Sequence, residues 1–197
     1  MTFALDNTLV VLIGFAGTGK YTVGRLLAER TGAKLVDNHL INNPVFTVVG
    51  ADGVTPLPAP VWEKVAAIRR LVYEAVREIA PPGLSFIFTL EMREKDPAAH
   101  RAFRDLEELA LARRALLVPV RLVCDVEELC RRVVHPARAA RLKDISPDNA
   151  RRKFAEHTVL DPQHENTRTV DVTARTPEES AAAVLREIEL IVEARGK

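Results

Sequence analysis

Short apolar runs alternate with segments of helical periodicity along the whole chain. Residues 8–13 (TLVVLI) are β-branched and aliphatic, which is typical of a strand buried on both faces of a parallel sheet. By this pattern, strands are predicted at 8–13, 33–37, 84–90, 115–124 and 167–173. Helices are predicted up to about residue 32 and at 61–80, 97–114, 126–132, 146–159 and beyond 176. The alternation predicts an α/β fold, with helices on both faces of a five-stranded parallel sheet.

Glycine, proline and capping residues mark where these elements break. Residues 50–60 are rich in glycine and proline and are predicted to form a loop. Pro119 is awkward inside a central strand, because it cannot donate a hydrogen bond to a neighbouring strand. Thr176 and Glu179 have the spacing of a capping box and are expected to open the last helix.

The first strand leads directly into Gly14-Phe15-Ala16-Gly17-Thr18-Gly19-Lys20, and a helix follows. The glycines let successive backbone N–H groups point into one concavity, and the helix N-terminus adds partial positive charge. Lys20 then supplies an ammonium group for the β- and γ-phosphates. A chance glycine-rich turn is the alternative, but the flanking strand and helix favour a nucleotide-binding P-loop. The residues expected to contact the nucleotide are Gly14, Ala16, Gly17, Thr18, Gly19, Lys20, Tyr21 and Thr22.

Position 21 departs from the usual motif, which has Ser or Thr after the lysine to ligate Mg²⁺. A phenol is too long for that role, so we expect Tyr21 to pack against a neighbour. The hydroxyl of Thr22 is expected to hold the metal together with Asp37. The alternative is that Thr22 faces the sheet and that Asp37 and water hold the metal alone.

Polar residues follow the second and third strands, and in a parallel sheet these ends meet at the ligand crevice. Asp37 is expected to contact a substrate hydroxyl or Mg²⁺, or else to cap the next segment. His39 is expected to touch the substrate or to lie on the surface. Glu91 is expected to act as a general base or to order water around the metal, with a surface role as the alternative.

Residues 131–153 are strongly basic, whereas the chain as a whole is nearly neutral. This segment fits a lid that closes over ATP, in which Arg138 and Arg141 stabilise charge on the transferring phosphoryl group. A solvated basic face is the alternative. A nucleic-acid surface is disfavoured, because Phe154, directly after the segment, is the one aromatic residue there and no stacking pattern is present.

The composition adds broad limits. With 197 residues the chain is expected to form one domain, 1–197, with the lid at 131–153 inside it. The net charge of +1 argues against a general polyanion binder. The two cysteines lack metal-site spacing and favour a reduced, cytoplasmic protein. No apolar run has the length of a membrane span, and the run before the P-loop lacks the basic residues of a signal peptide.

The stretch from Gly19 to Ala28, with the later Leu35-Val36-Asp37, resembles shikimate kinases and their relatives among the small P-loop kinases. This resemblance implies the three-layer αβα P-loop NTPase fold. It also implies ATP and Mg²⁺ as cofactors, and places Arg132, Arg175 and Pro177 beside the adenine.

The shikimate-binding half of the pattern does not transfer. His39 replaces a second acidic residue, Glu91 and its neighbours replace a glycine-rich turn, and no arginine lies near Gln163. The sequence therefore predicts a kinase that moves the γ-phosphoryl group of ATP to a hydroxyl of an unidentified small molecule. The alternatives are a nucleotide-binding regulator with little catalysis and a nucleic-acid end kinase.

Overall fold

The computed structural model describes residues 3–195 and contains a five-stranded sheet in which every pair of neighbouring strands is parallel. The strand order is β2-β3-β1-β4-β5, so the strand before the P-loop lies in the middle. The strands are β1 (Thr8–Ile13), β2 (Lys34–Asp37), β3 (Phe86–Leu90), β4 (Leu116–Val123) and β5 (Arg168–Asp171). The predicted α/β class and the five strands are confirmed.

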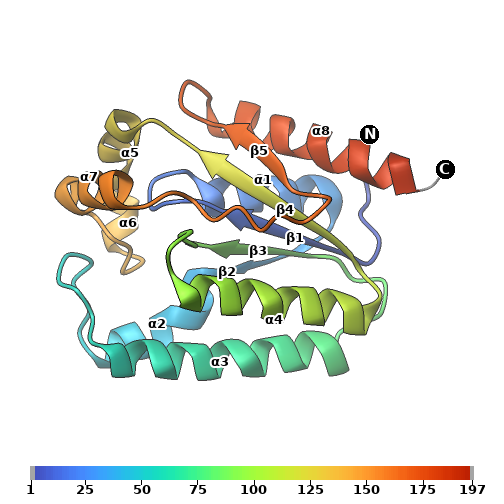
Figure 1. Cartoon of the computed structure of the whole chain (residues 1–197), viewed down its shortest axis with the longest axis horizontal. Helices are drawn as coiled ribbons and strands as arrows, with labels where there is room; N and C mark the ends of the chain where they lie inside the picture. The colour runs from blue at the N-terminus through green and yellow to red at the C-terminus, as the bar shows by residue number, and fades with distance from the viewer. Residues whose placement is uncertain (1–2, 196–197) are drawn as a thin grey trace.

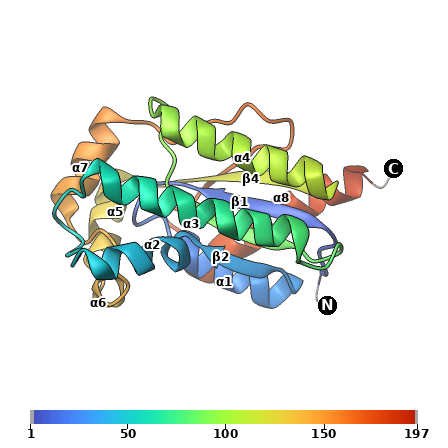
Figure 2. The same cartoon turned by 90° about the horizontal axis from the view of Figure 1, so that it is seen from below.

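Helices cover both faces of this sheet (Figures 1 and 2). α1 and α8 pack together on one face, and α3 and α4 lie on the other. In Figure 1 the shorter helices α5, α6 and α7 gather at the left, beyond the tips of the strand arrows. The helices are α1 (Lys20–Thr31), α2 (Asn38–Val48), α3 (Ala59–Glu78), α4 (Pro97–Arg113), α5 (Val126–Val133), α6 (Pro136–Ala139), α7 (Pro147–Glu156) and α8 (Pro177–Arg195).

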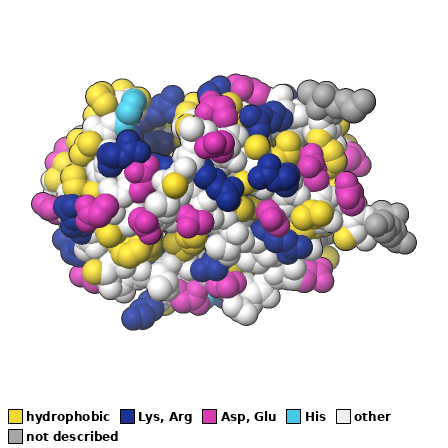
Figure 3. Space-filling view, turned by 90° about the horizontal axis from the view of Figure 1, so that it is seen from above, with side chains coloured by type: hydrophobic (Ala, Val, Ile, Leu, Met, Phe, Trp, Pro, Cys, Tyr) yellow, Lys and Arg dark blue, Asp and Glu magenta, His cyan; other side chains and the backbone are white. Residues whose placement is uncertain are grey.

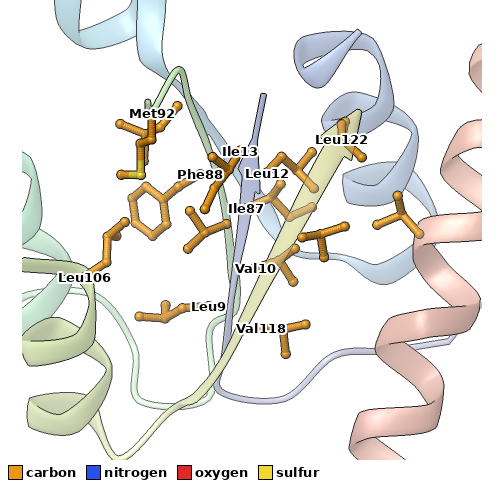
Figure 4. Close-up of a cluster of buried hydrophobic side chains, with 14 of the residues drawn as sticks. Leu9, Val10, Leu12, Ile13, Ile87, Phe88, Met92, Leu106, Val118 and Leu122 are labelled. Atoms are coloured by element: carbon orange, nitrogen blue, oxygen red, sulfur yellow. The ribbon is translucent and has the colours of Figure 1, made fainter. Parts of the chain in front are cut away.

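The core lies on both sides of β1, whose six residues are all buried (Figure 4). Successive side chains of a strand point to opposite faces. In Figure 4, Leu9 accordingly lies on the side of Leu106 from α4, whereas Val10 lies beside Val118 of β4. Burial on both faces explains the unbroken apolar run that the sequence shows here.

Several local predictions can be compared with the structure. The Thr176–Glu179 capping box is confirmed, because each residue's side chain accepts a hydrogen bond from the other's backbone N–H, at 3.2 and 2.8 Å. The helix predicted at 146–159 ends earlier, at Glu156. Pro119 does lie inside β4, but β5 pairs with β4 only from Val120 onward, so the proline precedes that ladder.

The surface seen from above in Figure 3 shows basic and acidic side chains interspersed. This distribution agrees with the small net charge of the chain. Within the described residues, the helices are all too short or too polar to cross a membrane.

Candidate active site

A cavity of about 1840 Å³ opens at the carboxyl ends of the strands. It is bordered by the P-loop (residues 14–20), by helices α2, α3 and α4, and by the basic segment (residues 131–153). Every residue predicted above for the site lines this cavity except Gly14. The structure thus brings the predicted residues together, while their individual roles stay predictions.

The P-loop needs glycine both where a side chain would not fit and where the backbone has a positive φ. A Cβ atom on Gly14 would lie 2.7 Å from the Leu122 carbonyl oxygen. Gly17 and Gly19 have φ angles of 94° and 87°, a region that favours glycine. Gly19 caps α1, so the free N–H groups of the first helical turn face the cavity that the loop borders.

The Lys20 side chain folds back over the loop. Its Nζ donates to the carbonyl oxygens of Gly14 and Phe15 at 2.7 and 2.8 Å. Burial lowers the pKa of Lys20 to about 7, and the positive charges of Arg138 and Lys143 act in the same direction, against the opposing effect of Glu91. An anion that enters the cavity would therefore favour the protonated, charged form of Lys20.

Tyr21 packs against a neighbour, as expected for a phenol at this position. Its ring lies beneath the Arg141 guanidinium, with 3.8 Å between the guanidinium carbon and the ring centroid. Thr22 is half-buried and also lines the cavity, so its hydroxyl remains a candidate metal ligand.

Asp37 lies at the end of β2 and is buried, with only 5% of the residue exposed. Its Oδ1 accepts a hydrogen bond from the Thr89 hydroxyl at 2.6 Å. Its Oδ2 accepts a hydrogen bond from the backbone N–H of His39, so Asp37 caps α2. The same Oδ2 lies 3.4 Å from the Nζ of Lys143. The capping role and the position in the cavity therefore occur together rather than as alternatives.

His39 is half-buried on the first turn of α2. Its Nδ1 lies 3.0 Å from Asn43 Oδ1, and its ring meets Phe46 edge-on with 6.0 Å between centroids. Burial and the nearby Lys143 charge lower the pKa of His39 to about 4, so the imidazole is neutral at pH 7. Its place on the cavity wall favours the substrate-contact alternative over a simple surface position.

Glu91 follows β3 and is half-buried rather than free on the surface. Its Oε1 lies 3.2 Å from the Nζ of Lys153, which also lies 3.0 Å from Asp144 Oδ2. Burial alone would lower the pKa of Lys153, but the two carboxylates raise it above its ordinary value. Lys153 therefore stays charged and links Glu91 to the basic segment.

The basic segment contains the end of α5, all of α6 and most of α7. Several of its charges are paired nearby, such as Arg131 with Glu128 and Arg151 with Glu127. Arg138 instead donates two hydrogen bonds to the backbone carbonyl of Asp144, at 3.1 and 2.8 Å. Neither Arg138 nor Arg141 forms an ion pair with any residue in the described range 3–195. These two arginines therefore remain available for an anion in the cavity.

Arg132 organises the loop after β5. Its Nη2 donates to the carbonyl oxygens of Val172, Thr173 and Arg175, at 2.8, 3.3 and 3.3 Å. Arg175 and Pro177 line the same end of the cavity. The residues expected beside the adenine thus form one connected wall.

Lys143 and Arg69 are two residues of the cavity that no sequence motif indicates. Lys143 reaches Asp37 across the fold, a contact that no local pattern reveals. Arg69 lines the cavity from α3, and its buried Nε has no hydrogen-bond partner among residues 3–195. Arg69 lies midway between the buried residues Val65 and Tyr73 of α3. A cation on the apolar side of a helix is the sequence signal that could have indicated a functional role for Arg69.

The comparisons with known proteins agree with this arrangement. A shikimate kinase from Synechococcus elongatus is 39% identical over 77 residues, which are 35% of this chain and 40% of that protein, so the match spans less than half of that relative. The shikimate kinase of Streptomyces coelicolor is 33% identical over 192 residues, covering 94% of this chain and 98% of that protein. A gluconokinase structure from Sinorhizobium meliloti has a TM-score of 0.64 at 19% identity and covers 96% of each chain.

No protein-family model matches the chain. The parallel sheet, its helical layers and the central P-loop define the fold of the P-loop kinases. Because its similarity to the Streptomyces coelicolor protein extends over nearly the full length of both, the chain belongs to the shikimate kinase family.

Proposed function

We propose that this protein is an ATP-dependent kinase that transfers the γ-phosphoryl group of ATP to a hydroxyl of a small molecule. One observation carries the proposal: a single cavity contains the P-loop lysine, two arginines that have no ion-pair partner among residues 3–195, and the buried carboxylate of Asp37. Phosphoryl transfer depends on positioning and on charge stabilisation, so these groups are the ones it needs together. Membership of the shikimate kinase family supports the same reaction class.

The nucleotide half of the site is built from the P-loop and the wall around Arg132. The loop amides and Lys20 would hold the phosphates, and Arg175 and Pro177 would flank the adenine. The hydroxyl of Thr22 and the carboxylate of Asp37 fit Mg²⁺, which prefers oxygen ligands and retains several waters. When bound, Mg²⁺ neutralises charge on the phosphates.

The protein's own groups account for the proton and the developing charge. Thr89 and Lys143 fix the carboxylate of Asp37 beside the metal position, where it would orient the acceptor hydroxyl while the new O–P bond forms. Arg138 and Arg141 would stabilise the negative charge as the bond to ADP breaks. Glu91, held by Lys153, would accept the proton of the acceptor hydroxyl or order water around the metal.

The acceptor half of the cavity lies between α2, α3 and α4. Its wall includes Trp62 and the guanidinium of Arg69. The ring of Trp62 meets that of Phe46 edge-on, with 5.6 Å between the ring centroids. Neutral His39 occupies the position where the resemblance to shikimate kinases calls for an acid. These differences favour a hydroxylated acceptor other than shikimate.

The test is a screen of small hydroxylated metabolites for ADP release, with the phosphorylated product verified by ³¹P NMR. Shikimate, gluconate and an oligonucleotide with a free 5′-hydroxyl belong in the panel. We expect one small-molecule class to yield a phosphate ester. ATP binding without any ester product would instead favour the nucleotide-binding regulator, and a product from the oligonucleotide alone would favour the end kinase.

A further inference from the structure

Tyr21 stands where the P-loop motif usually has a short hydroxyl, and two cations from the basic segment lie over its ring. The Arg141 guanidinium carbon is 3.8 Å from the ring centroid, and the Lys143 Nζ is 4.8 Å from it. A cation within about 6 Å of an aromatic face is attracted by the ring quadrupole. Tyr21 therefore binds the turn that follows α6.

Leu142, the residue between these two cations, makes an apolar contact of its own. Leu142 has a φ of 53°, which is strained for a residue that carries a Cβ. Its side chain packs against the apolar cluster between α2 and α3, formed by Ile41, Phe46, Val61 and Val65. This apolar contact holds the turn to α2 and α3, and the contacts of Arg141 and Lys143 with Tyr21 hold it to α1.

The same turn also contacts the acceptor side of the cavity. Lys143 pairs with Asp37 at 3.4 Å, and the Ile145 N–H donates to the Gly53 carbonyl at 3.1 Å. Gly53 permits this approach, since a Cβ there would lie 2.5 Å from the Lys143 carbonyl oxygen. Residues 141–145 thus connect the P-loop, the end of β2 and the loop before α3.

From these contacts we infer that Tyr21 is a positioning residue that docks the basic segment on the first turn of α1, directly after the P-loop. The inference rests on the proposed kinase function and extends it. The ring supplies a partner for Arg141 and Lys143 that does not depend on bound phosphate. In this chain, the residue after the P-loop lysine therefore contacts the basic segment instead of supplying a metal ligand.

Amide exchange, measured residue by residue by NMR in the nucleotide-free protein, tests this docking. The amide of Ile145 is the reporter, because it bonds across to Gly53. We expect Tyr21→Ser to speed its exchange about tenfold, since a cation–π contact of this kind has that order of strength. Tyr21→Phe, which keeps the ring, should leave the exchange within about twofold of the parent. Arg151→Ala is the matched control, because the ion pair of this exposed arginine within residues 3–195 is with Glu127, away from Tyr21.

Unchanged Ile145 exchange in Tyr21→Ser would overturn the inference, as would equal acceleration in Tyr21→Phe. If Tyr21→Ser does not fold, Arg141→Gln removes the same contact from the other side and should accelerate the same amide. Parent-like exchange in that variant would also contradict the docking role. Because no nucleotide is present, the outcome does not depend on whether the protein transfers phosphate.

Discussion

At the scale of single residues, Lys20 is an ammonium group whose pKa lies near neutral pH. Burial and the neighbouring Arg138 and Lys143 lower its pKa to about 7, whereas an entering phosphate would raise it again. The protonated form is therefore favoured in the complex and only partly populated before it. This difference makes proton uptake a signature of phosphate binding at Lys20.

We expect ATP binding to take up about one proton near pH 8, where the free lysine is largely neutral. The affinity should fall as the pH rises from 7 toward 10. Calorimetry in buffers of different ionisation enthalpy measures the uptake directly. Lys20→Met, which cannot titrate, should remove it, and uptake that persists in this variant would assign the proton to another group.

Thr22 offers a second test at this scale. If its hydroxyl helps to hold Mg²⁺, Thr22→Ala should weaken Mg²⁺-dependent ATP binding by about 1 kcal/mol, the value of an ordinary polar contact. Binding measured in EDTA should change little. If Thr22→Ala behaves like the parent while Asp37→Ala loses the Mg²⁺ dependence, the metal role belongs to Asp37 alone.

At the scale of elements, three side chains of the basic segment contact three different parts of the site. Arg141 covers Tyr21, Lys143 pairs with Asp37 and Lys153 pairs with Glu91. Among the described residues, the Arg138 side chain bonds to a backbone carbonyl and to no carboxylate. Its guanidinium is therefore the group in this segment best suited to meet charge that develops during the reaction.

We expect Arg138→Ala to lower kcat about tenfold or more, which corresponds to about 1.4 kcal/mol of lost transition-state stabilisation. The affinity for ATP should change much less, because the P-loop holds the phosphates. Steady-state kinetics with the acceptor found by the screen provide the measurement. A kcat equal to that of Arg151→Ala, in which an exposed arginine is removed, would reduce Arg138 to a structural residue.

At the scale of the whole molecule, local patterns predicted the sheet well, because β1 and its neighbours are buried runs bounded by turns. They did not predict α2, whose sequence has weak helix propensity and contains Pro44. That helix depends on its Asp37 cap and on the packing of Ile41 and Phe46. Such support comes from tertiary contacts, which are invisible to a local pattern.

In the site, too, local patterns predicted some features, whereas others depend on tertiary contacts. The P-loop was predictable because its residues are contiguous and their conformation demands glycine. The links from Lys143 to Asp37 and from Lys153 to Glu91 join residues far apart in the chain. Their formation depends on how the basic segment folds back over the strand ends, which spacing along the sequence does not encode.

The central claim is that the P-loop binds ATP through Lys20, and calorimetric titration of Mg²⁺-ATP into the parent and into Lys20→Ala tests it most directly. We expect the substitution to cost about 2–3 kcal/mol of binding, the value of a charge-assisted contact to phosphate. Lys64→Ala, at an exposed lysine of α3, is the matched control and should bind like the parent. Equal ATP affinity in the parent and in a folded Lys20→Ala variant would contradict the account.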